Sequence, residues 1–467
     1  MDCRSIVHLA LILGMVGGCN CSKSRSSGSP DRFQRLADKD AAVSSKEGAS
    51  RFPFQCATVN GGALYALGAA RGADDEDDSG LDIPFGINVG QAVGFEGGFA
   101  VSAVDGRGGK SHAIIGFLGS NAENGRTLDL GRVYGDADPP RVAGNARVLM
   151  VALADTDAAG RTLRLVRVED IKTEAKLTKG AEASVSQNTS AAFSIAVNAD
   201  RGIVAWEEAD RKTEKGQIVA ASFSVQSLAM PKKPWVLSGR NSDAQLPQVA
   251  SRPGGFWLAW VQSGIAGPGE PQLKRGQPAN GKGGRRLSED ETTSPAVDLG
   301  AQDLYACALD GDGHAIAKPL RATEGVAHVV AYDLAVLDDG SAILAWRDDD
   351  TSPGVESQVV HLGRVGLDGH VDRYRIEDDS IGVGAPQLLV DPTANPNDRV
   401  WLAVGNTGEK VSLVRLQPNG NPTSLIVDDA DLGTSNPLVR FGGALLVARQ
   451  RGKGVDLEPL VCRFSDQ

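Results

Sequence analysis

The acidic segment Asp310-Gly311-Asp312-Gly313-His314 has the residue spacing that comes closest to a metal site in this sequence. Oxygen ligands at alternate positions suit Ca²⁺. The glutamate that completes an EF-hand loop is missing from its required place, however, and Asp-Gly pairs are also typical of tight turns. We therefore interpret this segment as a turn. The run Asp74-Asp75-Glu76-Asp77-Asp78 is interpreted as a solvated loop, because one acidic run rarely encloses an ion by itself.

Motifs for other chemistry are incomplete or missing. Gly109-Lys110-Ser111 resembles the end of a phosphate-binding loop, but Val104 stands where that motif needs its first glycine. The six histidines form no pair at zinc spacing, and there is neither an HExxH motif nor a GxSxG nucleophile elbow. The sequence therefore predicts no catalytic residue, no metal site and no cofactor.

Three tryptophans, Trp206, Trp260 and Trp346, stand at one position of a repeated segment. An aromatic cluster could line a sugar-binding surface, but their apolar neighbours and their place inside a strand favour packing in the core. Sialidases also use propellers, but their repeated Ser-x-Asp-x-Gly-x-x-Trp box does not appear at these turns. We therefore assign the tryptophans to the core.

A long insertion at residues 264–303 is the candidate recognition loop, because long loops on a rigid scaffold often carry recognition. It is rich in Gly and Pro, and a disordered loop without a binding role would have the same composition. Its basic residues are Lys274, Arg275, Lys282, Arg285 and Arg286. The net charge of −11 for the whole chain disfavours nucleic acid as a partner and makes this basic loop a local exception.

Seven dense apolar segments recur along the chain, most of them after a glycine-containing turn. They are residues 98–101, 147–151, 202–206, 255–260, 340–346, 399–404 and 443–447. Most of these segments are followed by a second extended segment, then by an Asp-Gly or Asn-Gly turn, and then by a third extended segment with a weaker strand pattern. These turn pairs supply the positive φ angles of tight hairpins, and Val, Ile and Trp fit half-buried strands. Each repeated unit is therefore predicted to form a four-stranded antiparallel meander.

The predicted fold class is all-β, a single β-propeller over residues 51–467. The 57 Gly, 22 Pro and 5% aromatic residues among 467 describe a chain of many short elements. A single meander would leave apolar faces in water, whereas sheets arranged radially cover one another. Seven four-stranded blades fit the repeats best, with six or eight as alternatives.

Closure of the ring needs an extra strand, because the last repeat at residues 437–464 supplies only three. The natural donor is the segment 52–59, which contains Cys56. If this segment pairs beside the last strand, Cys56 and Cys462 could form a disulfide in an oxidising compartment. Cys307 is instead expected to be a small core residue.

The N-terminus has the form of an export signal. Residues 6–16 are an apolar run too short to span a bilayer, for which roughly 20 residues are needed. The motif that follows, Val16-Gly17-Gly18-Cys19, resembles the lipobox of bacterial lipoproteins. That resemblance covers about twenty residues and implies removal of residues 1–18 and attachment of diacylglycerol to Cys19, with palmitate as a typical acyl chain.

The lipobox resemblance also implies a location in the bacterial cell envelope. Two or three acyl chains hold a protein on a membrane, because each buried methylene contributes roughly 0.8 kcal/mol. Asn20 is not the aspartate associated with inner-membrane retention, so we expect the outer membrane rather than the inner one. Residues 19–50 are polar and predict a flexible tether. We expect a monomer.

Two classes of function remain open. The first is a non-catalytic binding or scaffold lipoprotein whose loops contact an envelope protein or glycan. The alternative is a carbohydrate-active hydrolase or lyase whose site is assembled from several blades on the propeller face. A concave central site with a carboxylate pair about 5 to 10 Å apart would favour the enzyme.

Overall fold

The computed structural model describes residues between 54 and 464, and the longest of its gaps are residues 68–86 and 264–300. The described residues form 29 β-strands and no helix. Accordingly, this part of the chain has no helix long and apolar enough to cross a bilayer. The prediction of an all-β protein is confirmed.

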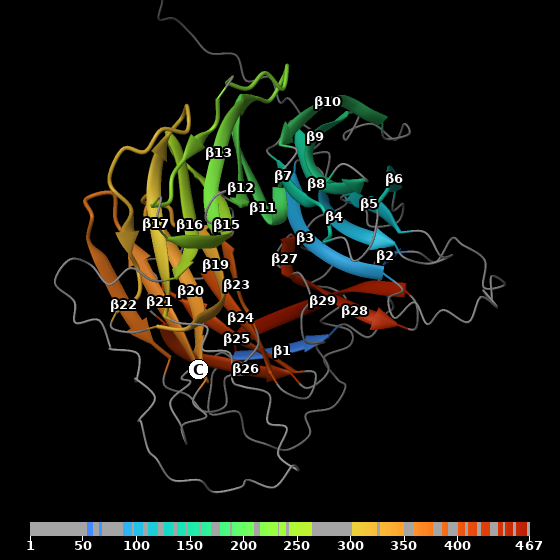
Figure 1. Cartoon of the computed structure of the whole chain (residues 1–467). Helices are drawn as coiled ribbons and strands as arrows, with labels where there is room; N and C mark the ends of the chain where they lie inside the picture. The colour runs from blue at the N-terminus through green and yellow to red at the C-terminus, as the bar shows by residue number, and fades with distance from the viewer. Residues whose placement is uncertain are drawn as a thin grey trace, which may run out of the picture.

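The strands form antiparallel sheets that follow one another along the chain (Figure 1). The first three sheets are β3 (Ile87–Phe95), β4 (Gly98–Asp105), β5 (His112–Gly119), β6 (Arg126–Arg132); β7 (Arg141–Gly144), β8 (Leu149–Asp157), β9 (Gly160–Glu169), β10 (Thr178–Ser186); and β11 (Thr189–Asn198), β12 (Arg201–Ala209), β13 (Gly216–Ser224), β14 (Trp235–Val236). The next three are β15 (Asp243–Arg252), β16 (Gly255–Ser263), β17 (Gln302–Asp310), β18 (Leu320–Arg321); β19 (Val329–Val336), β20 (Ala342–Asp349), β21 (Gln358–Val365), β22 (Val371–Arg375); and β23 (Pro386–Val390), β24 (Val400–Asn406), β25 (Lys410–Leu416), β26 (Pro422–Asp429).

The last sheet joins the two ends of the described chain. Its strands are β27 (Leu438–Phe441), β28 (Ala444–Arg451), β29 (Gly454–Phe464), β1 (Phe54–Thr58) and β2 (Tyr65–Leu67). Both β1 and β2 pair with β29, and in Figure 1 the blue β1 lies among the red C-terminal strands. The register of β1 and β29 places Cys56 directly opposite Cys462.

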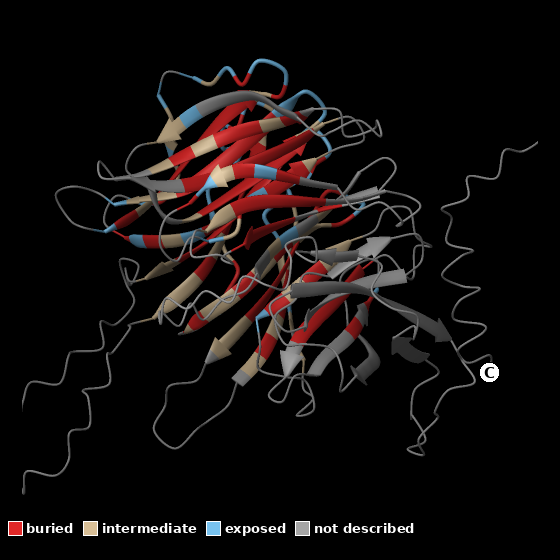
Figure 2. Ribbon diagram, turned by 90° about the vertical axis from the view of Figure 1, so that its right-hand side faces the viewer, coloured by how far each residue is buried: buried red, intermediate tan, exposed pale blue. Residues whose placement is uncertain are grey.

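The first strand of each successive sheet contacts the first strand of the next. We call β3, β7, β11, β15, β19, β23 and β27 the inner strands, and β27 in turn contacts β3. The seven apolar segments identified in the sequence lie on or overlap the second strands, which pair directly with the inner ones. Buried positions are concentrated on second strands such as β8, β12, β16, β20 and β24. Figure 2 shows the buried residues in red along the strands.

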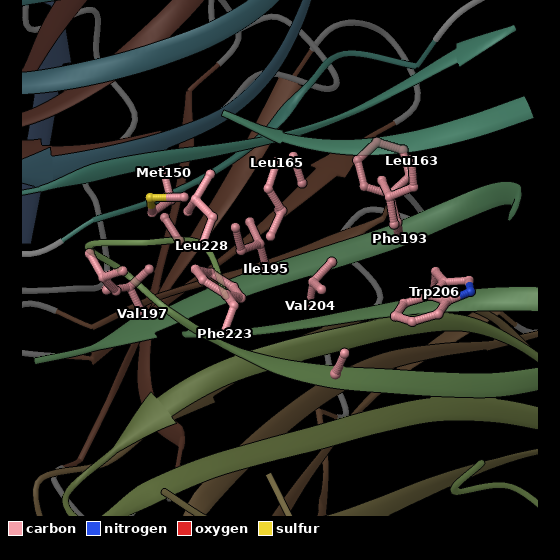
Figure 3. Packing of buried hydrophobic residues seen from close by; sticks show 14 of the residues in the cluster. Met150, Leu163, Leu165, Phe193, Ile195, Val197, Val204, Trp206, Phe223 and Leu228 are labelled. Carbon is pink, nitrogen blue, oxygen red and sulfur yellow. The ribbon is translucent and has the colours of Figure 1, made fainter. Parts of the chain in front are cut away.

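Hydrophobic packing joins neighbouring sheets face to face. Between β8 and β9 on one side and the sheet that starts at β11 on the other, Met150 and Leu165 pack with Phe193, Val204 and Phe223 (Figure 3). These side chains are all nearly inaccessible to solvent. Because each sheet covers the apolar face of the next, an isolated sheet would expose its core to water.

Turns confirm the role expected of Asp-Gly pairs. Gly313, Gly340 and Gly369 follow aspartates and have φ angles of 86°, 81° and 87°. In the first of these turns Asp310 Oδ1 accepts hydrogen bonds from the backbone nitrogens of Asp312 and His314, both at 2.9 Å. The interpretation of residues 310–314 as a turn is confirmed.

Candidate functional site

A row of polar side chains follows the inner strands. One polar residue on each of β7, β11, β15, β19 and β23 lies opposite an alanine of the second strand. The corresponding polar residue of β3 lies in a bulge. We call this set the polar rung; its members are Gln91, Arg141, Ser194, Gln248, Asp333 and Gln387. The shared register places these side chains at matching positions in successive sheets.

Several members of the polar rung accept a hydrogen bond from a backbone amide of the following inner strand. The pairs are Gln91 with Val142 at 3.4 Å, Ser194 with Val249 at 3.1 Å, Gln248 with Leu334 at 3.1 Å and Asp333 with Leu388 at 2.6 Å. These distances join a side-chain oxygen to a backbone nitrogen. The amides would otherwise lack a partner between sheets, so each bond stabilises the junction by about 1 kcal/mol.

Gln248 and Tyr332 form further hydrogen bonds at the junction between β15 and β19. Besides its contact with Leu334, the Gln248 side chain donates from Nε2 to the Tyr332 carbonyl at 2.7 Å. The buried Tyr332 hydroxyl lies 2.9 Å from the Ala259 carbonyl and also contacts the carbonyl of Leu246. Burial raises the pKa of Tyr332 well above its usual value, so the hydroxyl keeps its proton.

Asp333 is the charged acceptor of the rung. Part of its side-chain surface is accessible to water, yet the carboxyl lies deep inside the protein, and that depth governs its charge. Burial raises the pKa of Asp333 to about 6, against the opposing effects of the Leu388 and Leu334 amides and of Arg141. A carboxyl with this pKa can both take up and release a proton near neutrality.

Arg141 is the cation of the rung and extends from β7, a strand of a different sheet from Asp333. Its side chain is exposed, and its charge is close enough to lower the pKa of Asp333. A guanidinium can bind a carboxylate or sulfate through two parallel hydrogen bonds. Together the two residues offer an anion-binding group and a titratable carboxyl within one electrostatic environment.

A polar hollow of about 290 Å³ lies away from the polar rung, at the turns that follow β19 and β21. Arg364 there pairs with Asp339 and donates to Ser341 Oγ at 3.1 Å. Although partial burial acts in the opposite direction, the Ser341 hydroxyl and amide and the Arg364 guanidinium keep the pKa of Asp339 below its usual value. Because the guanidinium is already neutralised, this hollow is better explained as a stabilised turn than as an anion site.

The candidates from the sequence lie elsewhere. Trp206, Trp260 and Trp346 have exposed fractions of 1%, 1% and 3%, so their assignment to the core is confirmed. Cys307 is also buried, and burial raises the pKa of its thiol to about 11, as expected of a core residue. Among the described residues, no group of three or more His, Cys, Asp or Glu side chains could hold a metal ion.

The predicted lipidation site Cys19 and the acidic run 74–78 lie outside the described residues, as do Gly109 and Lys110. The same is true of the signal peptide, the tether and residues 264–300 of the insertion, with the basic residues Lys274, Arg275, Lys282, Arg285 and Arg286. The side chains of Cys56 and Cys462 are not described, although their backbones are paired.

The polar rung was missed by sequence reasoning. A signal for it exists, because Arg141, Ser194 and Gln248 each precede the alanine that they face by about eleven residues. The inner strands β3, β11, β15 and β19 are interrupted by bulges, as between Gln245 and Gln248, which break the alternation that would reveal them as strands.

Comparison with known proteins gives a fold but no family. No family model and no curated protein matches the chain. Among solved structures, a polysaccharide lyase of family PL25, an ulvan lyase, is similar with a TM-score of 0.51 at 8% identity, covering 80% of this chain and 94% of the other. The polysaccharide lyase Uly1 has a TM-score of 0.49 at 9% identity, with 82% and 91% covered.

A third similar structure is the β-propeller domain of the Trilobed protease from Pyrococcus furiosus, with a TM-score of 0.42 at 12% identity. It covers 82% of this chain and 96% of that domain. At such low identity, similarity is informative about fold alone. The arrangement of the sheets, in which the first strand of each contacts the first strand of the next, makes the chain an all-β protein with a β-propeller-like fold.

Proposed function

We propose that this protein binds and cleaves an acidic polysaccharide at the centre of its β-propeller, by elimination. The observation that carries the proposal is the placement of Arg141 and Asp333 on inner strands of two different sheets, within electrostatic reach of each other. The PL25 ulvan lyase is a polysaccharide lyase of similar fold, and we propose the same broad class of substrate here.

The proposed architecture is a propeller of seven four-stranded blades completed by the N-terminal strand β1. The succession of contacts between inner strands, including that between β27 and β3, supports a ring. The pairing of β1 with β29 supports closure by the two ends of the chain. In such a ring the polar rung surrounds the axis.

Elimination fits the chemistry of the rung better than hydrolysis. Glycoside hydrolysis usually needs two carboxyl groups on either side of the scissile bond, whereas the described rung contains one. In the proposed step, Arg141 binds the uronate carboxylate, and the Asp333 carboxylate takes the proton from the neighbouring ring carbon. The electron pair of that C–H bond forms a carbon–carbon double bond, and the glycosidic C–O bond breaks. The leaving oxygen takes a proton from water.

We further propose that the protein is an envelope lipoprotein anchored through Cys19, with the outer membrane as its site. The lipobox-like motif Val16-Gly17-Gly18-Cys19 supports this location. A tether over residues 19–50 would hold the propeller away from the lipid surface, where it could contact an extended glycan.

The test uses the purified full-length protein and a panel of uronate-containing polysaccharides. Elimination creates a double bond conjugated to the carboxylate, so cleavage is followed by ultraviolet absorbance. Arg141→Ala is expected to lose binding, and Asp333→Asn is expected to bind but not cleave. Arg364→Ala, which changes the hollow beside Asp339, is the matched control and should keep both properties. New reducing ends without ultraviolet absorbance would indicate a hydrolase, and binding without cleavage would favour the non-catalytic binding protein.

A further inference from the structure

Leu246 has an unusual backbone conformation in an inner strand. Its φ angle is 56°, in the left-handed region that large side chains rarely adopt. Of the described non-glycine residues with positive φ, Ala199 lies in the turn after β11 and Leu228 in the loop after β13, both outside strands. Leu246 lies within β15, where its conformation interrupts the ladder to β16 between Gln245 and Gln248.

The surrounding structure holds this strained conformation in place. The Tyr332 hydroxyl contacts the Leu246 carbonyl, and the next residue, Pro247, is buried. The Leu246 side chain is nevertheless 42% exposed, while Ala244, two residues earlier, is fully buried. A strained backbone conformation, held by a buried tyrosine, therefore leaves an apolar side chain exposed to solvent. Strain of this kind is characteristic of functional sites.

The position of β15 relates Leu246 to the proposed ring. This strand is the inner strand of its sheet, with β16 paired on one side and the inner strands β11 and β19 packed against it. Leu246 is close to the start of the strand, so in the proposed ring its exposed side chain would border the end of the axial space at which β15 begins. Gln248 and, on β19, Asp333 lie farther along the same two strands.

We infer that Leu246 is a substrate-contacting residue whose side chain packs against the apolar C–H face of a sugar ring. The inference rests on the proposed function, because it needs a polysaccharide in the axial space. A sugar ring presents C–H groups on its faces and hydroxyls at its edge, so an exposed aliphatic side chain beside polar amides matches both parts of the ring. Leu246 would thus select the position of the ring, while Arg141 binds its anionic group.

The test compares Leu246→Asn and Leu246→Gly, since both residue types tolerate a left-handed backbone. Loss of the apolar contact should raise KM for the acidic polysaccharide about tenfold, with kcat changed less than about twofold. Relief of strain should leave the thermal midpoint unchanged or raise it by a few degrees. Leu246→Met, which keeps the apolar contact, should have a KM close to that of the unmodified protein.

Ala199→Gly is the matched control, because it relieves similar strain in an exposed turn. It should raise the thermal midpoint without changing KM. If the unmodified protein cleaves the polysaccharide and both polar variants keep its KM, the inference about Leu246 is wrong and the proposed function stands. If the protein binds without cleaving, the same comparison is made with the dissociation constant. Failure of the unmodified protein to bind any acidic polysaccharide would overturn both.

Discussion

Asp333 Oδ2 on β19 accepts a hydrogen bond from the backbone nitrogen of Leu388 on β23 at 2.6 Å, and so joins the inner strands of two sheets. The same carboxyl is the group whose pKa rises to about 6. One side chain is thus placed both to hold neighbouring sheets together and to exchange a proton. Substitutions at this position should therefore separate into effects on stability and effects on activity.

Asp333→Asn is expected to stabilise the protein at high pH and not at low pH. The pKa of Asp333 is raised in the folded state, so its contribution to stability is fully present below the unfolded value of 3.8 and is lost as the pH rises through about 6. Asparagine keeps an oxygen for Leu388 but carries no charge. The free energy of unfolding should rise by on the order of 1 to 3 kcal/mol at about pH 8. Urea unfolding at about pH 8 and about pH 4 measures this difference; equal effects at both pH values would contradict the shifted pKa.

Gln248→Leu is expected to lower the free energy of unfolding by about 2 kcal/mol. The leucine is similar in size but leaves the Leu334 amide and the Tyr332 carbonyl without their partner. Urea unfolding near neutral pH measures the loss. Gln245→Ala, on the same strand, is the control and should cost less, because Gln245 makes no such link between sheets in the part of the chain that the structure describes. Equal losses in the two variants would argue against the bridging role.

Cys56 and Cys462 are expected to form a disulfide when the protein is made in an oxidising compartment. Their backbones are directly opposite in an antiparallel pair, and the spacing of such pairs lies within the range that a disulfide needs. Non-reducing peptide mapping should find the two peptides linked. Cys56→Ser and Cys462→Ser should lower the thermal midpoint equally, and a reductant should lower it only in the unmodified protein. Two free thiols in exported protein would refute this prediction.

Cys19 is expected to carry the lipid anchor. Labelled palmitate should enter the protein when it is produced in a bacterial host, and the protein should be recovered with the outer membrane. Cys19→Ala should abolish both labelling and membrane association, whereas Cys21→Ala should change neither. Label that persists in the Cys19 variant would place the modification elsewhere.

Sequence reasoning predicted the second strands well and the inner strands poorly. The second strands are continuous apolar runs, such as residues 255–260, because they are covered on both faces by neighbouring sheets. Several inner strands contain bulges and polar residues, so neither hydrophobicity nor alternation marks them.

The electrostatic influence of Arg141 on Asp333 could not be predicted. Arg141 and Asp333 belong to sheets that are far apart in the sequence, and only the packing of the inner strands brings their charges together. The raised pKa of Asp333 has the same origin, since burial depends on sheets that the local sequence does not specify. Turn residues were easier to predict from the sequence, because an Asp-Gly pair favours a turn through its own backbone conformation.

The pairing of Thr58 with Leu460 imposes an order on biogenesis. A contact between residues roughly 400 positions apart cannot form until the whole chain has been synthesised, and contacts of such long range form slowly. Strand β1 therefore stays unpaired until β29 has been synthesised. During that time its exposed edge can pair with the wrong strand. On the proposed export route, slow completion of the fold would keep the chain unfolded for longer, and an unfolded chain is easier to thread through a translocation pore.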